Sequence, residues 1–444
     1  MAAAKGKGKG NALGKLGKLT ELRQRILFVV GALVVFRLGS FIPVPGVNPD
    51  AMSNLVNGNG LMDMFNMFSG GALERFSVFA LGVIPYISAS IVFQMMGSVV
   101  PSLMALRKEG EAGKRKMTMY TRYATVGLAL LQSFGIAAAL QGQVAAGGAP
   151  VVYTPGPGFI LSSVIGLTAG TMLLTWIGEQ MTERGVGNGI SLLIFAGIIA
   201  GLPGAVVQTL GMASNGELSL LKLLLVFGVA LGVTAFVVFV ERAQRRITVN
   251  YARRSGGQKA YMNQTSSLPL KINMAGVIPP IFASSLLMFP ATAITWFSTG
   301  SPSRWVQELT QQLTPGQPFY EMVSAALVFG FAFFYTAIVF NADETADNLK
   351  RSGALIPGIR PGKATASYVD AVMTRLTLIG AIYLVAVCAV PSFMQAYWHV
   401  PFYFGGTSLL IVVVVVMDFT AQIQAHLVSH QYESLLKKAN LRRS

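Results

Sequence analysis

The sequence predicts an all-α membrane protein with ten transmembrane helices, and three observations carry this prediction. Hydrophobic residues make up 53% of the 444-residue chain and charged residues only 12%, with a mean hydropathy of +0.57; a soluble domain carries about a quarter charged residues. Ten apolar stretches approach the ~20 residues that a helix needs to cross a bilayer. Finally, 30 of the 34 Lys and Arg residues lie at the two chain ends and in alternate loops. Because basic loops stay on the cytoplasmic side, both termini are expected there.

The ten stretches divide into two groups of five. An odd number of spans in each half gives the halves opposite topology, so we expect two pseudo-symmetric, inverted five-helix halves. The halves cover residues 26–210 and 211–430, between a basic cytoplasmic arm at 1–25 and a basic cytoplasmic tail at 431–444. The expected spans are Ile26–Pro43, Phe76–Val100, Tyr123–Leu140, Phe159–Gly178, Ile190–Leu210, Leu218–Val240, Ile272–Trp296, Met322–Phe340, Leu376–Met394 and Val400–Met417.

The N-terminal arm is rich in Gly and Lys and is expected to be disordered. The first apolar run lacks a small-residue cleavage site and is followed by further spans, which favours an uncleaved first helix over a signal peptide. The net charge of +16 could suggest nucleic acid. Its concentration in alternate loops is explained by membrane orientation alone, so we expect no DNA binding.

A short apolar segment, Leu61–Phe68 (LMDMFNMF), interrupts the pattern of long spans. Eight helical residues cover only ~12 Å, which is too little to cross a bilayer. The glycine pair Gly70-Gly71 then precedes the second span. From the residues alone this segment either folds into the protein or lies on the bilayer surface as an interfacial helix.

Two cytoplasmic loops, residues 241–270 and 341–371, are longer than ordinary connections. In the first, Arg246–Tyr251 alternates in a way that predicts a strand projecting into water. In the second, ETADNLKRSG predicts a short helix with Gly353 after its end, followed by a turn over Pro357–Gly362. Long structured loops tend to carry function, and a solvated loop that only sets orientation is the alternative.

Catalytic motifs are absent from the sequence, which argues against an enzyme and against a bound cofactor. The His426/His430 pair has helical i, i+4 spacing, but no third ligand accompanies it, so no metal site is expected. The single cysteine, Cys388, excludes an intrachain disulfide. Transporters usually carry acidic or histidine relays inside their spans, whereas Arg37 is the only charge deep in a span here. These absences predict a passive conduit that is driven by a partner.

Several long strings of the sequence resemble the bacterial SecY family, the channel subunits of the Sec protein translocon, which is related to Sec61-alpha. The resemblance covers essentially the whole chain and is carried by TERGVGNGIS, VFVERAQRRITVNYARR, LPLKINMAGVIPPIFASS, ETADNLK, PGIRPG and PFYFGGTSLLIVVVVVMDF. It implies two five-helix halves around an hourglass pore, with a lateral gate toward lipid and a short plug helix. It also implies the cytoplasmic (inner) membrane of a bacterium.

The resemblance assigns roles to residues at three places. The plug would span Leu61–Ala72, which favours the folded-in alternative, and its named residues are Leu61, Met64, Phe65, Met67, Phe68, Gly70 and Gly71. The apolar pore ring would consist of Val83, Ile87, Ile190, Ile194, Ile281 and Ile411, with Val83 in place of a commoner, larger Ile. The lateral gate would contain Ser88, Ile91, Gln94, Asn273, Ile278 and Phe282.

Such a ring suits a conduit for varied chains, because apolar side chains hold no passenger strongly and a dry neck blocks ions. At the gate, Gln94 and Asn273 are polar groups near membrane depth, where an unsatisfied donor is costly. We hypothesise a hydrogen bond between them that breaks on opening. A bond formed within one half is the alternative.

The resemblance also implies partners. The SecA ATPase or the ribosome would dock on the basic loops, through Arg245, Arg246, Arg253, Arg254 and Arg360. RNA phosphates and acidic proteins both accept such a patch, so the sequence does not rank the two partners. Ala342-Asp343 stands where the family often has a proline and a basic residue, which makes this loop less positive. The further partners implied are the small subunits SecE and SecG, signal-bearing preproteins and membrane lipid.

The predicted function is a protein-conducting channel. It would export unfolded preproteins and release hydrophobic helices sideways into the membrane. The alternative function is a secondary transporter of a small solute, which the missing intramembrane acids and the long basic loops disfavour.

Overall fold

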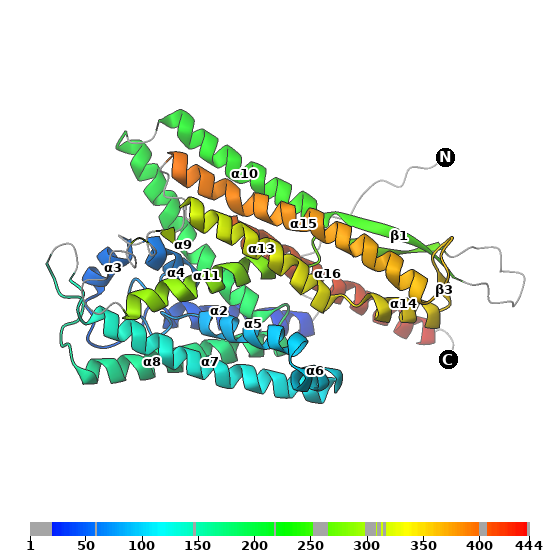
Figure 1. The fold of residues 1–444 in the computed structure, drawn as a ribbon, viewed down its shortest axis with the longest axis horizontal. Coiled ribbons are helices and arrows are strands. Elements are labelled where there is room, and N and C mark those ends of the chain that lie inside the picture. Colours follow the sequence, from blue (N-terminus) through cyan, green and yellow to red (C-terminus); the bar gives the residue numbers. More distant parts are fainter. Residues whose placement is uncertain are drawn as a thin grey trace, which may run out of the picture. The chain divides into compact units, whose positions relative to one another are not determined.

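The computed structural model describes residues 20–57, 60–144, 148–216, 219–251, 265–297, 308, 312–313, 317–398 and 406–441. Within these ranges the chain is mostly helical, and each of the ten predicted spans overlaps a helix (Figure 1). The seventh, Ile272–Trp296, is wrong at its start, because its helix begins only at Ile278, and residues 400–405 of the tenth lie outside the described residues. The ten helices are α2 (Thr20–Gly39), α5 (Ile84–Val99), α7 (Glu111–Leu140), α8 (Pro157–Arg184), α9 (Gly189–Ser214), α10 (Leu220–Arg242), α11 (Ile278–Phe297), α13 (Pro318–Val339), α15 (Lys363–Trp398) and α16 (Gly406–Leu441).

Among the described residues, seven helices are both long and apolar enough to cross a membrane. They are Glu111–Leu140, Pro157–Arg184, Gly189–Ser214, Leu220–Arg242, Pro318–Arg351, Lys363–Val390 and Thr407–Val428. Shorter apolar helices run over Ile84–Val99 and Ile278–Leu287. Helix α2 also carries Arg23, Arg25 and Arg37, which dilute its apolar character. The protein is thus a multi-pass membrane protein, and ten crossings stay a prediction.

The second predicted span, Phe76–Val100, is wrong at its start, because the helix begins only at Ile84. Residues 76–83 form turns instead, with positive φ at Phe76 (45°) and Gly82 (57°). The apolar residues of this stretch other than Val78 are buried. The stretch pairs with the segment after α2, where Val44 N donates to Phe76 O at 2.9 Å. Its hydropathy therefore reflects packing inside the protein rather than contact with lipid.

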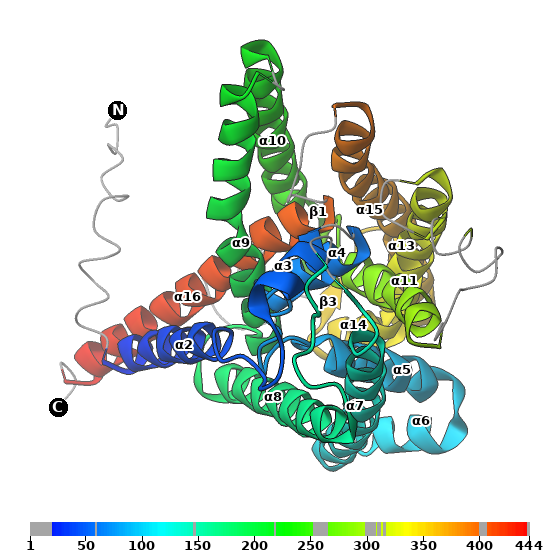
Figure 2. The same cartoon turned by 90° about the vertical axis from the view of Figure 1, so that its left-hand side faces the viewer.

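The described chain separates into two compact units that each combine distant segments. Unit 1 contains residues 1–86, 122–201 and 415–444, and unit 2 contains residues 87–121 and 202–414. In unit 1, α2 packs against α8, and the short helices α3 (Pro49–Asn57) and α4 (Gly60–Ser69) pack against each other (Figure 2).

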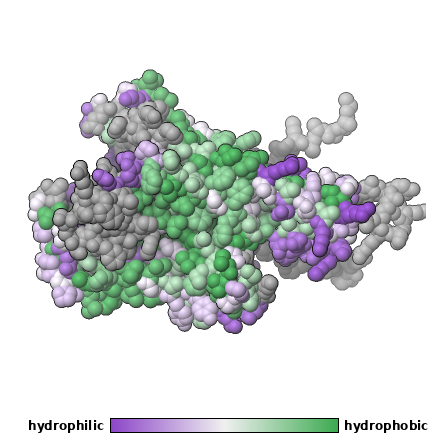
Figure 3. Space-filling view, viewed as in Figure 1, coloured by the Kyte–Doolittle hydropathy of each residue, from purple (hydrophilic) through white to green (hydrophobic). Residues whose placement is uncertain are grey.

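In unit 2, α13 packs against both α11 and α15, and α14 (Ala342–Arg351) packs against α15. The helix α6 (Pro101–Lys108) follows α5. A three-stranded sheet of order β2-β1-β3 is made by β1 (Gln244–Tyr251), β2 (Thr265–Lys271) and β3 (Ala354–Leu355). Both pairings are antiparallel, with Thr248 opposite Ser267 and Tyr251 opposite Ala354. Hydrophilic side chains gather around β1, β3 and α14, beside the apolar helices of this unit (Figure 3).

Candidate functional site

The short helix predicted before the glycine pair is present as α4, and it is tucked into unit 1. Phe65, Met67 and Phe68 are buried, which argues against a helix lying free on the bilayer surface. The side chains of Leu61 and Met64 lie outside the described residues. An apolar helix that is held inside the protein by a short connection has the structure that a plug would need.

The glycine pair ends α4 in a backbone conformation that favours glycine. Gly70 and Gly71 have φ of +71° and +81°, where a side chain costs about 1–2 kcal/mol. Gly70 also approaches α9 closely, because a Cβ on it would lie 2.9 Å from the Cα of Gly197. Nothing lies within 4 Å of a Cβ on Gly71. Gly70 is therefore required for close packing, whereas Gly71 is required only for its backbone angle.

Arg37, the charge deep in the first predicted span, pairs with the end of α4. Its Nη1 donates to the carbonyl oxygen of Gly70 at 2.7 Å. Its guanidinium also lies over the ring of Phe41, 5.0 Å from the centroid, and Arg75 lies over the same ring at 4.3 Å. No sequence signal points to this contact, because it joins residues 33 positions apart.

The predicted ring residues are mostly buried side chains. Ile190 is half-buried, and it packs on Gly178 of α8, where an added Cβ would lie 2.4 Å from Ile190 Cδ1. The other five, each 6% exposed or less, are Val83, Ile87, Ile194, Ile281 and Ile411. Val83, Ile190 and Ile194 belong to unit 1 and the other three to unit 2. A ring formed by both units stays a prediction.

The predicted gate residues lie on two elements of unit 2. Ser88, Ile91 and Gln94 lie on α5. Phe93 of the same helix stacks on Tyr120 of α7, with 6.3 Å between the ring centroids. Ile278 and Phe282 lie on α11, while Asn273 precedes it. Phe282 makes edge-to-face contacts with two rings of α13. Its ring centroid lies 5.9 Å from that of Phe331 and 6.4 Å from that of Tyr335.

The hydrogen bond hypothesised between Gln94 and Asn273 is not formed in the described part of the chain. Gln94 Nε2 donates to Ser90 Oγ of its own helix at 2.9 Å. The amide of Asn273 is saturated elsewhere: Nδ2 donates to Glu241 Oε1 at 2.6 Å and to Gly276 O, and Oδ1 accepts from Gly276 N. Burial explains the outcome, since Asn273 is only 4% exposed and satisfies its donors with nearby acceptors.

The two long loops fold into one structure, which we call the loop platform (β1, β2, β3, α14 and the turn at residues 357–362). A hydrophobic core joins both loops to the start of α15; it consists of Ile247, Leu270, Ile356, Val369, Val372, Met373 and Leu376. The strand predicted at Arg246–Tyr251 is confirmed as β1. The sequence did not reveal its partner β2, nor that the second loop adds a strand to the same sheet.

The second loop has the predicted helix and turn. Asn341 caps α14, with its Oδ1 accepting from the backbone N of Asp343 at 3.1 Å and of Glu344 at 3.3 Å. Gly353 follows the helix with φ of +70°. In the turn, the carbonyl oxygen of Arg360 accepts from Thr365 Oγ1 at 2.9 Å. This bond fixes the backbone at Arg360 to the first turn of α15.

The predicted docking cations lie on the outside of the loop platform where the structure describes them. Arg245, Arg246 and Arg360 are exposed, while the predictions for Arg253 and Arg254 fall outside the described residues. Within the described residues no group of three His, Cys, Asp or Glu side chains could hold a metal ion. What the loop platform offers is a fixed, basic surface.

Comparison with known proteins agrees with this architecture. The SecY family model matches residues 77–420. Protein translocase subunit SecY of Escherichia coli K12 is 56% identical over 428 residues, covering 96% of each chain, and the same subunit of Vibrio cholerae is 57% identical over 429 residues with the same coverage. The chain belongs to the SecY family.

Solved structures of similar fold agree with membership of the SecY family. A structure described as that of a protein conducting channel matches with a TM-score of 0.66 and 15% identity, covering 92% of this chain and 93% of the other. A second, described in terms of a SecY plug domain that stabilises the closed channel, matches with a TM-score of 0.64 and 17% identity at the same coverage. Because only 15% and 17% of the residues are identical, these two matches show similarity of fold alone.

Proposed function

We propose that this protein is the channel subunit of a protein translocase. The observation that carries the proposal is identity above one half, along nearly the whole chain, to proteins named as translocase subunits. The protein is a channel rather than an enzyme, so a partner must supply the work.

The finer architecture is part of the proposal. Ten helices cross the membrane in two inverted five-helix halves, residues 26–210 and 211–430, around an hourglass pore. Helix α4 is the plug, and the six predicted aliphatic residues form the ring at the neck. Support comes from the burial of α4 and from its end at a glycine pair, which can serve as a hinge. Both termini and the loop platform face the cytoplasm of a bacterial cell.

The lateral gate lies between α5 and α11 in this proposal. Gln94 and Asn273 bond to their own surroundings, so the proposed gate has no hydrogen bond between these two residues, and its other named residues include the apolar Ile91 and Ile278. An apolar seam opens toward lipid without leaving a buried donor unsatisfied. That property suits the sideways release of hydrophobic helices.

The loop platform docks the energy source, SecA or a translating ribosome, and SecE and SecG complete the membrane complex. A docking surface needs cations at fixed positions. Ile247 and Val249 anchor β1 in the platform while Arg246 stays exposed, and the Thr365 bond holds Arg360 in place. Guanidinium groups presented this way suit carboxylate and phosphate partners alike.

The deciding experiment is reconstitution of the purified chain with SecE and SecG in proteoliposomes. We expect a preprotein to become protected from external protease only when SecA and ATP are both added. A preprotein whose signal segment has been deleted is the control and should stay accessible. Uptake of a small solute driven by an ion gradient alone, without any movement of the preprotein, would refute the channel and support the rival transporter.

A further inference from the structure

A short stem connects the loop platform to helix α11; it consists of residues 241–243 and 272–276. The ladder between β1 and β2 continues into the stem, where Ile272 N donates to Ala243 O at 3.3 Å. Beyond that bond, Asn273 Nδ2 donates to Glu241 Oε1 at 2.6 Å. Both residues are buried, although amide and carboxyl side chains are mostly exposed in proteins. The stem therefore ends in a polar contact that is shielded from water.

Asn273 also shapes the backbone that leads into α11. Its Oδ1 accepts from Gly276 N at 3.1 Å, and its Nδ2 donates to Gly276 O at 3.2 Å. Gly276 has a φ of +62°, in the left-handed region that favours glycine. Helix α11 then begins at Ile278. One side chain thus holds both Glu241 and the turn before α11, so a displacement of Asn273 displaces the start of that helix.

Helix α15 packs directly on the stem. A Cβ on Gly380 would lie 2.9 Å from Ile272 O, so the helix approaches the stem as closely as a glycine allows. About one turn further along α15, the ring centroid of Tyr383 lies 5.8 Å from that of Phe236. Phe236 belongs to α10, the helix that carries Glu241. The carboxylate of Glu241 interacts electrostatically with the hydroxyl of Tyr383.

The hydroxyl of Tyr383 has no hydrogen-bond partner among the residues that the structure describes. Tyr383 is only 6% exposed, and a buried hydroxyl is normally paired. Glu241 is thus held by Asn273, while a second donor within electrostatic range has no acceptor. An unpaired buried donor is costly in this arrangement and becomes favourable in any arrangement that brings it to the carboxylate.

We propose that Glu241 exchanges one donor for another when the start of α11 moves. Asn273 holds it in the arrangement seen here, and the Tyr383 hydroxyl holds it in a second one. Helix α10 continues directly into β1, and α15 shares the hydrophobic core of the loop platform, so Glu241 and Tyr383 stay with the platform while α11 moves. Glu241 keeps a donor in both arrangements, and no buried carboxylate is left unpaired. The inference rests on the proposed channel function and makes these three side chains positioning residues for α11, the proposed gate helix.

The test compares hydrogen exchange of the backbone amides at residues 274–278 in the full chain, assembled with SecE and SecG in nanodiscs. Tyr383→Phe removes no hydrogen bond of the arrangement seen here, but it removes the donor of the second one. The loss of a hydrogen bond to a charged group predicts a population of the second arrangement that is roughly tenfold smaller, and exchange that is roughly tenfold slower. Misfolding would accelerate exchange instead. Unchanged or faster exchange in Tyr383→Phe overturns the proposal.

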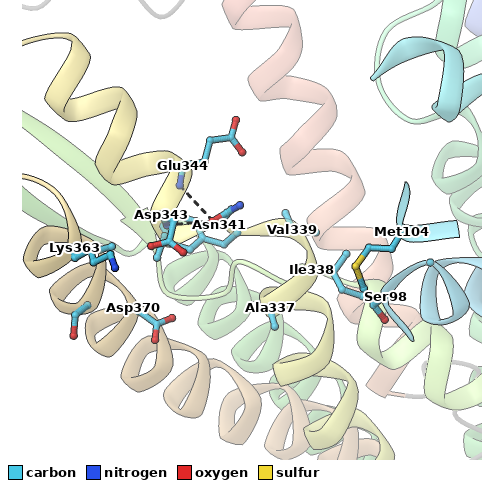
Figure 4. A pocket seen from close by; sticks show the side chains of 15 residues that line it. Ser98, Met104, Ala337, Ile338, Val339, Asn341, Asp343, Glu344, Lys363 and Asp370 are labelled. Carbon is cyan, nitrogen blue, oxygen red and sulfur yellow. Dashed lines mark hydrogen bonds between the residues drawn. The ribbon is translucent and has the colours of Figure 1, made fainter. Parts of the chain in front are cut away.

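Two control variants remove similar groups elsewhere in unit 2. Tyr368→Phe removes an exposed hydroxyl from the same helix. Asn341→Ala removes an asparagine that also shapes a turn, but one that caps α14 beside an open groove whose lining does not include the stem (Figure 4). Both variants should leave exchange at residues 274–278 unchanged. An equal slowing in Tyr368→Phe would contradict the proposal.

A double-mutant cycle tests the exchange of donors directly. Tyr383→Phe alone should not lower the midpoint of thermal unfolding. In the Asn273→Ala background Glu241 depends on the Tyr383 hydroxyl, so the same substitution should then lower the midpoint. Additive effects of the two substitutions overturn the proposal. A midpoint lowered by Tyr383→Phe alone does so too, because the hydroxyl would then be bonded already, for example to a buried water.

Transport separates this inference from the proposed function. In proteoliposomes that contain SecE and SecG, Tyr383→Phe should slow SecA-dependent preprotein transport by up to about tenfold while SecA binds as tightly as before. A side chain with a purely structural role would not leave the thermal midpoint intact and slow transport. Normal transport by Tyr383→Phe refutes the exchange of donors alone, whereas the absence of transport by the unaltered chain refutes the channel function.

Discussion

Removing the side chain of Arg37 should release the short helix α4. In the structure, Arg37 Nη1 donates to the carbonyl oxygen of Gly70 at 2.7 Å, at the point where α4 ends. A hydrogen bond from a charged donor contributes about 1.5–3 kcal/mol, and the half-buried position of Arg37 favours the lower end. A loss of about 1.4 kcal/mol is a tenfold change in an equilibrium. We therefore expect Arg37→Gln to raise the population with displaced α4 roughly tenfold.

Two assays measure this population. Hydrogen exchange of the backbone amides at residues 66–71 should accelerate roughly tenfold, whatever the role of α4. If α4 closes the pore, the resting ion conductance of planar bilayers that contain the protein should rise by a similar factor. The matched control is Arg75→Gln, which removes a cation over the same Phe41 ring. Unchanged exchange in Arg37→Gln, or an equal change in Arg75→Gln, would contradict the reasoning.

The glycine pair offers an independent perturbation of the same contact. Gly70→Ala places a methyl group 2.9 Å from the Cα of Gly197 and strains a φ of +71°. Gly71→Ala strains a φ of +81° but meets open space. Both substitutions cost about 1–2 kcal/mol in backbone strain, so only the excess in Gly70→Ala reports the packing of α4 on α9. Equal exchange rates in the two variants would show that this packing does not hold α4.

Three further predictions concern unit 2. Ile247→Ala should cost about 2–4 kcal/mol of stability in the loop platform and expose the loops to limited proteolysis. It should also weaken the proposed binding of SecA, whereas Thr248→Ala on the exposed face should have none of these three effects. Asn273→Leu should lower the midpoint of thermal unfolding more than Glu241→Gln, because only the former leaves a buried carboxylate without its 2.6 Å donor; equal midpoints would contradict this. If the loop platform docks SecA as proposed, Arg360→Ala should weaken that binding without changing the proteolysis pattern, since the backbone carbonyl of Arg360, and not its side chain, holds the turn.

The positions of most helices could be predicted from the sequence, because length and hydropathy are local properties. Local signals also sufficed for β1 and for the helix that ends before Gly353. The helix predicted over residues 76–83 was wrong, because an apolar segment has the same hydropathy whether it faces lipid or the protein interior. Hydropathy reports removal from water and does not distinguish the two environments.

The contacts that shape the candidate site could not be predicted from the sequence. The bond from Arg37 to Gly70 and the bond from Asn273 to Glu241 join residues 33 and 32 positions apart. No spacing rule selects such partners, because they depend on how whole elements pack. The hydrogen bond hypothesised between Gln94 and Asn273 at the gate is absent for the same reason. The sequence shows that Asn273 needs an acceptor near membrane depth, but not which acceptor is nearest.

The hydrophobic core beneath the loop platform argues for a role beyond orientation. Positive charge near the ends of spans is enough to orient a membrane protein, and a solvated loop could carry it. Here the two loops instead bury Ile247, Ile356 and Val369 together, while Arg246 and Arg360 stay exposed above that core. Ordering these loops costs conformational entropy that orientation does not require. Fixed cations on an ordered surface are what the binding of a large partner requires, so the order of these loops supports the proposal that the same charges serve both topology and docking.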